Sequence, residues 1–332
     1  MRQALLPTCL IAVTFAAACA PISIQDERRL ASYQRNAALY FEGGKLDQAM
    51  LQIDRGLEIE PDDYKLSGLK GAVLVRATSN NPKIVDEAAA LLEQVYDWRS
   101  SLRHEPYVLF YYALARQRQG LRALGNAIRA EDRELRSADA EQKSELGGKA
   151  REAREQARLR LQQADELLDI LVERGEMLRL AHKHKLQIAR QTNSEDDFET
   201  SANAFLEAST EAQESVRTDV ETTTVAAYEQ ERIDFLRDLE EEELEVRALF
   251  ADWLYDRQRL EDAVEQINVV LERDPKRTPD YYNRGRVLLE LKRFDAAKQD
   301  FRRFLATSTM PAASEQMTFA AKALKSIERN RR

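Results

Sequence analysis

The sequence is poor in the residues that interrupt helices. Its 332 residues include 11 glycines and 8 prolines, whereas alanine, leucine, glutamate, arginine and glutamine recur throughout. These recurrent residues lose little free energy on entering a helix. The sequence also contains no run of alternating β-branched residues that would indicate a strand. We therefore predict an all-α protein.

Residue types that carry chemistry are scarce as well. There are 3 histidines, and His182 and His184 are two positions apart, which puts them on different sides of a helix. Metal ligands on a helix are normally three or four positions apart, so both are interpreted as solvated side chains. His104 has no second ligand near it in the sequence. Because no nucleophile–histidine set can be assembled, we predict no enzyme, no catalytic or metal-ligating residue and no cofactor.

No charge of one sign dominates the chain. Charged residues make up 33% of it, yet the net charge is only -8, so acids and bases are interspersed. Nucleic-acid binding needs a basic face that releases counterions, and none is indicated. The segments 43–45 and 147–149, both Gly-Gly-Lys, lack the other residues of a phosphate-binding loop. Both are predicted to be turns.

Cysteine occurs twice, as Cys9 and Cys19. Residues 4–18 are mostly apolar, follow a basic start and are too short to span a bilayer, which is typical of an export signal. The run ends in Ala-Ala-Ala-Cys at 16–19, which resembles the bacterial lipobox, although Ala16 stands where that motif prefers leucine. The resemblance implies removal of 1–18 and lipidation of Cys19. An ordinary secretory signal, cleaved after an A-x-A triplet, is the alternative.

A lipid at Cys19 would anchor the chain to a membrane of the cell envelope, with 19–29 as a short linker. Ala20 follows the cysteine, in place of the aspartate that resembles an inner-membrane retention signal. For a Gram-negative source this favours the outer membrane, facing the periplasm. With one thiol left, the mature chain could form no internal disulfide.

The C-terminal third repeats itself. Segments 244–277 and 278–311 align at a spacing of 34 residues, the period of the tetratricopeptide repeat. The positions where that repeat wants small, large and Pro residues are occupied in the first copy by Ala251, Leu254, Ala263, Ile267, Val270 and Pro275. In the second copy they are occupied by Gly285, Leu288, Ala297, Phe301 and Phe304. The resemblance implies a solenoid of helix pairs, closed by a capping helix within 312–332.

A third copy covers 30–63, with Tyr33, Ala37, Tyr40, Ala49, Ile53, Gly56 and Pro61 in the pattern. Residues 64–136 are interpreted as two divergent repeats. A small residue midway along the first helix lets the second helix approach closely, and the late proline ends the second helix.

The segment 137–243 differs in composition and is predicted to be a charged helical hairpin inserted between the repeats. Two apolar seams with steps of three and four are typical of coiled coils. They predict antiparallel arms over 149–190 and 195–238. Ser194 and Asp197 form a capping box for the second arm. The acidic run 238–245 is interpreted as a solvated face, with docking of a basic partner as the alternative. Trp98 and Trp253 are expected in the core.

The repeat resemblance implies a concave groove lined by first-helix residues. Carried over by position, these residues are Gln34, Ala38, Phe41, Glu42, Glu245, Ala248, Asp252, Tyr255, Asp256, Tyr282, Arg286, Leu289 and Glu290. Acids and tyrosines suit a partner segment with basic and apolar residues. The lysine and asparagine set with which some family members hold a terminal carboxylate is missing.

The resulting hypothesis is a membrane-anchored scaffold or adaptor for protein partners of a bacterial envelope complex, such as secretion, pilus, outer-membrane or polysaccharide-export machinery. The alternative is a ligand-binding accessory lipoprotein of a transporter. The partner's identity and the oligomeric state stay open.

Overall fold

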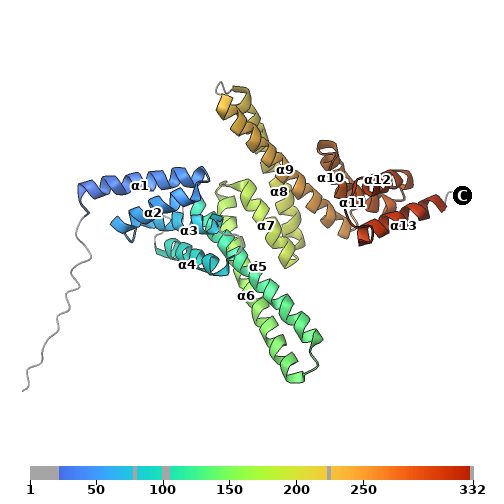
Figure 1. Cartoon of the computed structure of the whole chain (residues 1–332), viewed down its shortest axis with the longest axis horizontal. Coiled ribbons are helices and arrows are strands. Elements are labelled where there is room, and N and C mark those ends of the chain that lie inside the picture. Colours follow the sequence, from blue (N-terminus) through green and yellow to red (C-terminus); the bar gives the residue numbers. More distant parts are fainter. Residues whose placement is uncertain (1–21, 78–80, 99–104, 223–225, 330–332) are drawn as a thin grey trace, which may run out of the picture. The chain divides into compact units, whose positions relative to one another are not determined.

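The computed structural model describes residues 22–77, 81–98, 105–222 and 226–329, and every regular element in these ranges is an α-helix (Figure 1). The all-α prediction is confirmed. Cys19, the whole export signal and His104 lie outside the described residues, as does the side chain of Trp98. Among the helices described, none is long and apolar enough to cross a membrane.

The chain forms two compact units, the first ending at Ala115 and the second starting at Arg116. The first unit holds α1 (Ile24–Glu42), α2 (Leu46–Ile59), α3 (Tyr64–Ala77), α4 (Pro82–Trp98) and the start of α5 (Pro106–Arg136). A short turn joins α1 to α2, and α1 packs on α2 as α3 packs on α4 (Figure 1). These are the helix pairs predicted for 30–63 and for the first divergent repeat.

Small residues lie where helices of the first unit meet. Ala37, Ala49 and Ile53 are completely buried between α1 and α2. A Cβ added to Gly56 would come within 2.3 Å of the Leu66 side chain, so any larger residue would displace this buried leucine where α2 meets α3. Gly44 has a positive φ of 69° in the turn between α1 and α2, as its predicted role requires.

The second unit continues α5 and adds eight helices in the described ranges. They are α6 (Ala140–Glu173), α7 (Leu178–Thr192), α8 (Glu195–Thr222), α9 (Ala226–Asp256), α10 (Leu260–Arg273), α11 (Thr278–Glu290), α12 (Phe294–Thr307) and α13 (Glu315–Arg329). One apolar core runs from Leu186 in α7 to Ile327 in α13. The last helix buries Ala320, Ala323 and Ile327 and so covers the end of the stack, as predicted.

The tandem pairs α9–α10 and α11–α12 follow the predicted repeat logic. Ala263, Ala297 and Phe301 are fully buried. A Cβ on Gly285 would lie 2.9 Å from the Phe301 ring, so glycine is what lets α12 approach α11.

The predicted arm over 149–190 is wrong, because the chain turns within it. Helix α6 ends at Glu173, Gly175 has a positive φ of 68°, and α7 starts at Leu178. The predicted turn at 147–149 is also wrong, since these residues lie inside α6. Asp139 caps that helix upstream by accepting bonds from the amides of Glu141 and Gln142, and two glycines cost a helix only about 1 kcal/mol each.

Helix α5 differs from the predicted pair of short helices. It is one helix of 31 residues, and its second half packs on α6, where a Cβ on Gly120 would meet Leu161 at 2.7 Å. The second divergent repeat therefore does not close within 64–136. Helix α8 starts after Ser194, the predicted cap position, and the Ser194 hydroxyl donates to the Asp197 carboxylate, a bond between the two side chains of the predicted capping box. Helix α9 runs without a break from the predicted second arm into the first tandem repeat.

Candidate functional site

The first unit contains a hollow of about 290 Å³ that gathers four of the predicted groove residues. It is lined by Gln34, Ala38, Phe41, Glu42, Lys65, Leu66, Leu69, Glu105 and Tyr107. The Gln34 amide donates to Asp63 Oδ2 at 2.6 Å, and Asp63 Oδ1 accepts from the Leu66 amide at 2.8 Å. Gln34 is thereby held by the residue that caps α3, so its position does not depend on a ligand.

One polar group of this hollow, the Tyr107 phenol, keeps its proton. Burial and the nearby carboxylates of Glu105 and Asp63 raise the pKa of Tyr107 well above its usual range. The phenol therefore stays protonated at any physiological pH and can donate a hydrogen bond. Arg76 lies over the Phe41 ring at 5.2 Å and donates to the Phe41 carbonyl at 2.6 Å, which holds that aromatic wall in place.

A larger hollow of about 490 Å³ lies in the second unit, between α9, α11 and α13. It is lined by Asp252, Pro279, Tyr282, Asn283, Arg286, Phe304, Met310, Glu315, Gln316 and Phe319. Three of these, Asp252, Tyr282 and Arg286, are predicted groove residues. The Tyr282 ring lies 5.1 Å from Phe304 and 5.9 Å from Phe319, so one wall of the hollow is aromatic. We call this the C-terminal hollow.

Charged groups converge beside the aromatic wall. Arg286 lies over the rings of Tyr255, at 4.4 Å, and Tyr282, at 5.7 Å, and the Tyr255 hydroxyl donates to Glu290. Partial desolvation raises the pKa of Asp252, Asp256 raises it further, and Arg286 opposes the change. A cation brought to the Asp252 carboxylate would therefore be stabilised.

A smaller hollow of about 150 Å³ shares Asp252 with the C-terminal hollow and adds Asp256, Arg190 and Asn193. Trp253 forms its wall. The Trp253 ring stacks on Phe198 at 5.1 Å with an interplanar angle of 12°, and Arg257 covers it at 4.0 Å. Trp253 is thus partly buried against the core, close to its predicted place. Arg190 and Asn193 come from α7 and were not predicted, because they are about sixty residues away in the sequence.

Residues 281–307 match the model of the tetratricopeptide repeat family. The matched segment contains Tyr282, Arg286, Leu289 and Glu290, and it covers most of α11 and α12. No curated protein matches the chain. The repeat scaffold therefore rests on this match and on the helix pairs described above.

Solved tetratricopeptide structures are similar to this chain over most of its length. A tetratricopeptide repeat protein from Parabacteroides merdae is 14% identical, with a TM-score of 0.33, over 91% of this chain and 99% of that one. Yeast Tom70 is 12% identical, with a TM-score of 0.27, over 92% of this chain and 90% of that one.

Six predicted groove residues of the second unit do not line the C-terminal hollow; three of them, Tyr255, Asp256 and Glu290, are described above. Glu245 lines a different hollow, with Arg179 and Lys183 of α7. Leu289 faces the other side of its tetratricopeptide repeat, where it lines a hollow of about 520 Å³ with Phe294 and Ile327. Ala248 is half-buried in α9 and lines none of the hollows described here.

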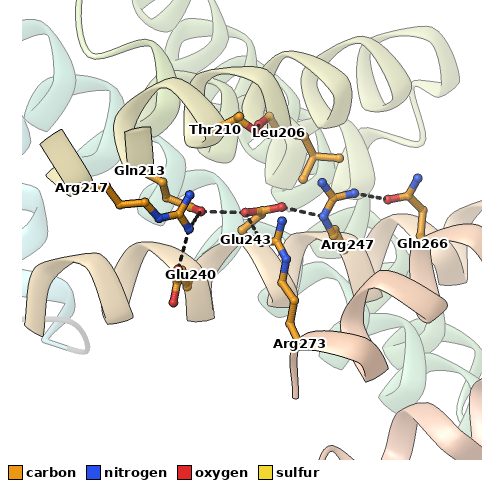
Figure 2. Close-up of polar contacts among 9 residues, drawn as sticks. All are labelled: Leu206, Thr210, Gln213, Arg217, Glu240, Glu243, Arg247, Gln266 and Arg273. Carbon is orange, nitrogen blue, oxygen red and sulfur yellow. Dashed lines mark hydrogen bonds and ion pairs between the residues drawn. The ribbon is translucent and has the colours of Figure 1, made fainter. Parts of the chain in front are cut away.

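The acidic run 238–245 is not simply a solvated face. Glu242 pairs with Arg179 and Lys183, and Glu243 is only 1% exposed. Figure 2 shows three donors around the Glu243 carboxylate: Arg247 at 2.7 Å, Gln213 at 2.7 Å and Arg273 at 2.8 Å. Burial alone would raise the pKa of Glu243, but these bonds outweigh it and lower the pKa. These two acids stabilise the fold and are already paired.

The prediction that both helix histidines are solvated is wrong: His182 is half-buried, with its Nδ1 atom enclosed, and His184 is enclosed further. The side chain of His184 is mostly enclosed, and its Nδ1 lies 2.7 Å from Gln117 Oε1 in α5. Burial, with Lys183 and Arg118 nearby, lowers the pKa of His184 to about 4. The ring is therefore neutral at physiological pH and donates to Gln117, so it is a packing residue between α5 and α7.

Proposed function

We propose that this chain is a lipid-anchored scaffold of the bacterial cell envelope, and that its C-terminal hollow binds a segment of a protein partner. The observation that carries the proposal is the aromatic wall of Tyr282, Phe304 and Phe319 beside the carboxylates of Asp252 and Asp256. An apolar side chain of the partner would pack on the rings, and a lysine or arginine would pair with the acids.

The charge balance of the site supports a basic partner segment. A cation near Asp252 would offset the desolvation and the repulsion from Asp256 that raise its pKa. Arg286 is already held between two tyrosine rings, so it narrows the hollow and does not neutralise both acids. Partner recognition by a peptide segment laid along paired helices also uses apolar anchors with flanking charges.

Binding is tested with two fluorescent peptides that share leucine and phenylalanine positions and differ only in lysine or glutamate between them. We expect the lysine peptide to bind more tightly, and the pair Asp252→Asn and Asp256→Asn to weaken its binding about tenfold, or ~1.4 kcal/mol. Glu265→Gln, an exposed acid on α10, is the matched control and should change nothing. Equal binding of both peptides would contradict the proposal.

The envelope anchor depends on Cys19 and is tested separately. We expect the full chain to incorporate labelled palmitate and to fractionate with membranes, and Cys19→Ala to abolish the label and release the chain. A chain that is unlabelled and soluble with Cys19 intact would refute the anchor and leave the peptide-binding proposal standing. Outer-membrane rather than inner-membrane fractions are expected from Ala20.

The hollow of the first unit favours a second candidate, an accessory lipoprotein that binds a small molecule for a transporter. Its volume of about 290 Å³ is at the lower end of ligand pockets, and its apolar walls carry a few polar groups. A thermal-shift screen would detect such a ligand, and Gln34→Leu should abolish the shift while peptide binding in the second unit continues.

A further inference from the structure

Helix α5 carries a second apolar seam. Positions 117, 121, 124, 128, 131 and 135 follow one another at steps of four and three, the heptad spacing by which one helix packs on another. Four of the six are Leu121, Leu124, Ile128 and Leu135, which we call the outer seam. The opposite seam of α5, with Ala123 and Ala127 buried, is not part of it.

The outer seam starts under a covering helix and then continues without one. Gln117, its first position, is 2% exposed and bonds His184 and Gln187 of α7. Leu121 is 37% exposed, Ile128 53% and Leu135 82%. Leu124 and Glu131 lie between them and are half-buried, so Ile128 and Leu135 are the most exposed apolar positions of the seam. Helix α6 packs on the adjoining side, where Gly120 meets Leu161 and Arg154 bonds Glu131, the one charged position of the outer half of the seam. Ile128 and Leu135 are left largely exposed.

The shape of the outer seam indicates that its binding partner is a helix and not a lipid surface. It is a narrow row of leucine and isoleucine in heptad register, which is the seam of a coiled coil. A helix that lies in a bilayer surface presents a wider apolar face, usually with aromatic residues. A helix laid along α5 beyond the end of α7 would extend a packing that α7 has already begun.

The charges beside the outer seam indicate which kind of partner helix would bind there. Arg122, Arg129 and Arg136 recur every seven residues along one edge. Asp132, the acid on this edge, is paired with Arg136 at 2.9 Å, and Arg129 donates only to Asn126, at 2.7 Å, among the bonds of the described residues. Acidic flanks would complement this row, whereas a second α5 packed antiparallel would bring an equal row of arginines against it.

We propose that the outer seam of α5 is a docking site for an amphipathic helix of a partner protein, with leucine or isoleucine in its seam and acidic residues on its flanks. Docking would complete a bundle with α5 and α6. The site is independent of the C-terminal hollow and of the anchor at Cys19.

The test uses the full chain in phosphatidylcholine nanodiscs and two fluorescent helical peptides of about four heptads. Both peptides have leucine and isoleucine in the seam, and their flanks carry either glutamate or lysine. We expect the glutamate peptide to bind at least about tenfold more tightly. Ile128→Glu and Leu135→Glu should each weaken it about tenfold, and Arg129→Glu with Arg136→Glu should reverse the preference. Leu159→Glu, at a site 46% exposed on α6, is the control.

Folding is not at risk in these variants, because the changed side chains are exposed, and circular dichroism melts should coincide with that of the unchanged protein. Equal binding of the two peptides, or full binding by Ile128→Glu, would overturn the proposal. So would loss of a dimer in sedimentation upon Ile128→Glu, which would show that a second copy occupies the seam. The proposal would also be overturned if the unchanged protein bound neither peptide but bound phosphatidylglycerol vesicles, and Ile128→Glu abolished the vesicle binding. A membrane surface would then occupy the outer seam.

Discussion

Glu243 offers the sharpest test of how the second unit is held together. Its carboxylate joins three helices, because Gln213 belongs to α8, Arg247 to α9 and Arg273 to α10 (Figure 2). Glu243→Ala removes the acceptor for all three donors. Arg247 keeps its bond to Gln266 at 2.7 Å, and the Arg273 side chain is 44% exposed, so water can replace part of what that residue loses.

The expected cost follows from this burial. Removing one partner of a buried ion pair costs about 3–5 kcal/mol, and the half-exposed Arg273 places Glu243→Ala at the lower end, about 3 kcal/mol. Glu240, one turn away on α9, is the matched control. It pairs with Arg217 at 2.8 Å, with both side chains well exposed, so Glu240→Ala should cost less than about 1 kcal/mol.

The assay is hydrogen exchange of the α8, α9 and α10 amides, since two-state unfolding is not assumed for a chain with two units. Protection there should fall in Glu243→Ala and not in Glu240→Ala. The pKa of Glu243 is lowered by folding, so its contribution is complete above its ordinary value of 4.5 and disappears as the pH falls through the folded value. The difference in protection between Glu243→Ala and the unchanged protein should therefore disappear in acid. Equal effects of the two alanine variants at pH 7 would refute this reasoning.

Three further predictions concern packing and charge. Gly285→Ala should lower the free energy of unfolding by about 1–3 kcal/mol in thermal melts, because the added Cβ would press on buried Phe301. Gly148→Ala, whose added Cβ would have nothing within 4 Å, should raise it by about 0.5–1 kcal/mol. A change of the same sign in both variants would contradict the packing at Gly285. His184 has a pKa lowered from 6.5 to about 4, so its contribution to stability is present above pH 6.5 and is lost toward pH 4, and urea midpoints of His184→Gln should vary less across that range. The pKa of Asp252 is raised, so binding of the lysine peptide should weaken on acidification from a higher pH than an ordinary carboxyl group would give, and an unchanged pH profile in Asp252→Asn would exclude this residue from the site.

Features that depend on a few neighbouring residues could be read from the chain. The turn at Gly44, the cap at Ser194 and the small residues at Ala37 and Gly285 each meet a requirement set within one helix pair. Such a pair recurs at a fixed period, so its pattern is local and repeated. This is why the repeat that holds Gly285 was predicted correctly, and why Asp252, Tyr282 and Arg286 were assigned to one groove.

Only the tertiary structure showed which helices pack on one another and which side chains become buried between them. Periodicity shows that a stripe of α5, α6 or α8 is apolar, but it does not show which of these stripes pack on one another. The predicted arm over 149–190 followed one continuous stripe across the turn at Gly175. Glu243 and His184 looked like solvated side chains because their partners, Gln213 and Gln117, lie 30 and 67 residues away. Burial is a property of the assembled helices, and a charge or a ring changes its role only once distant segments close around it.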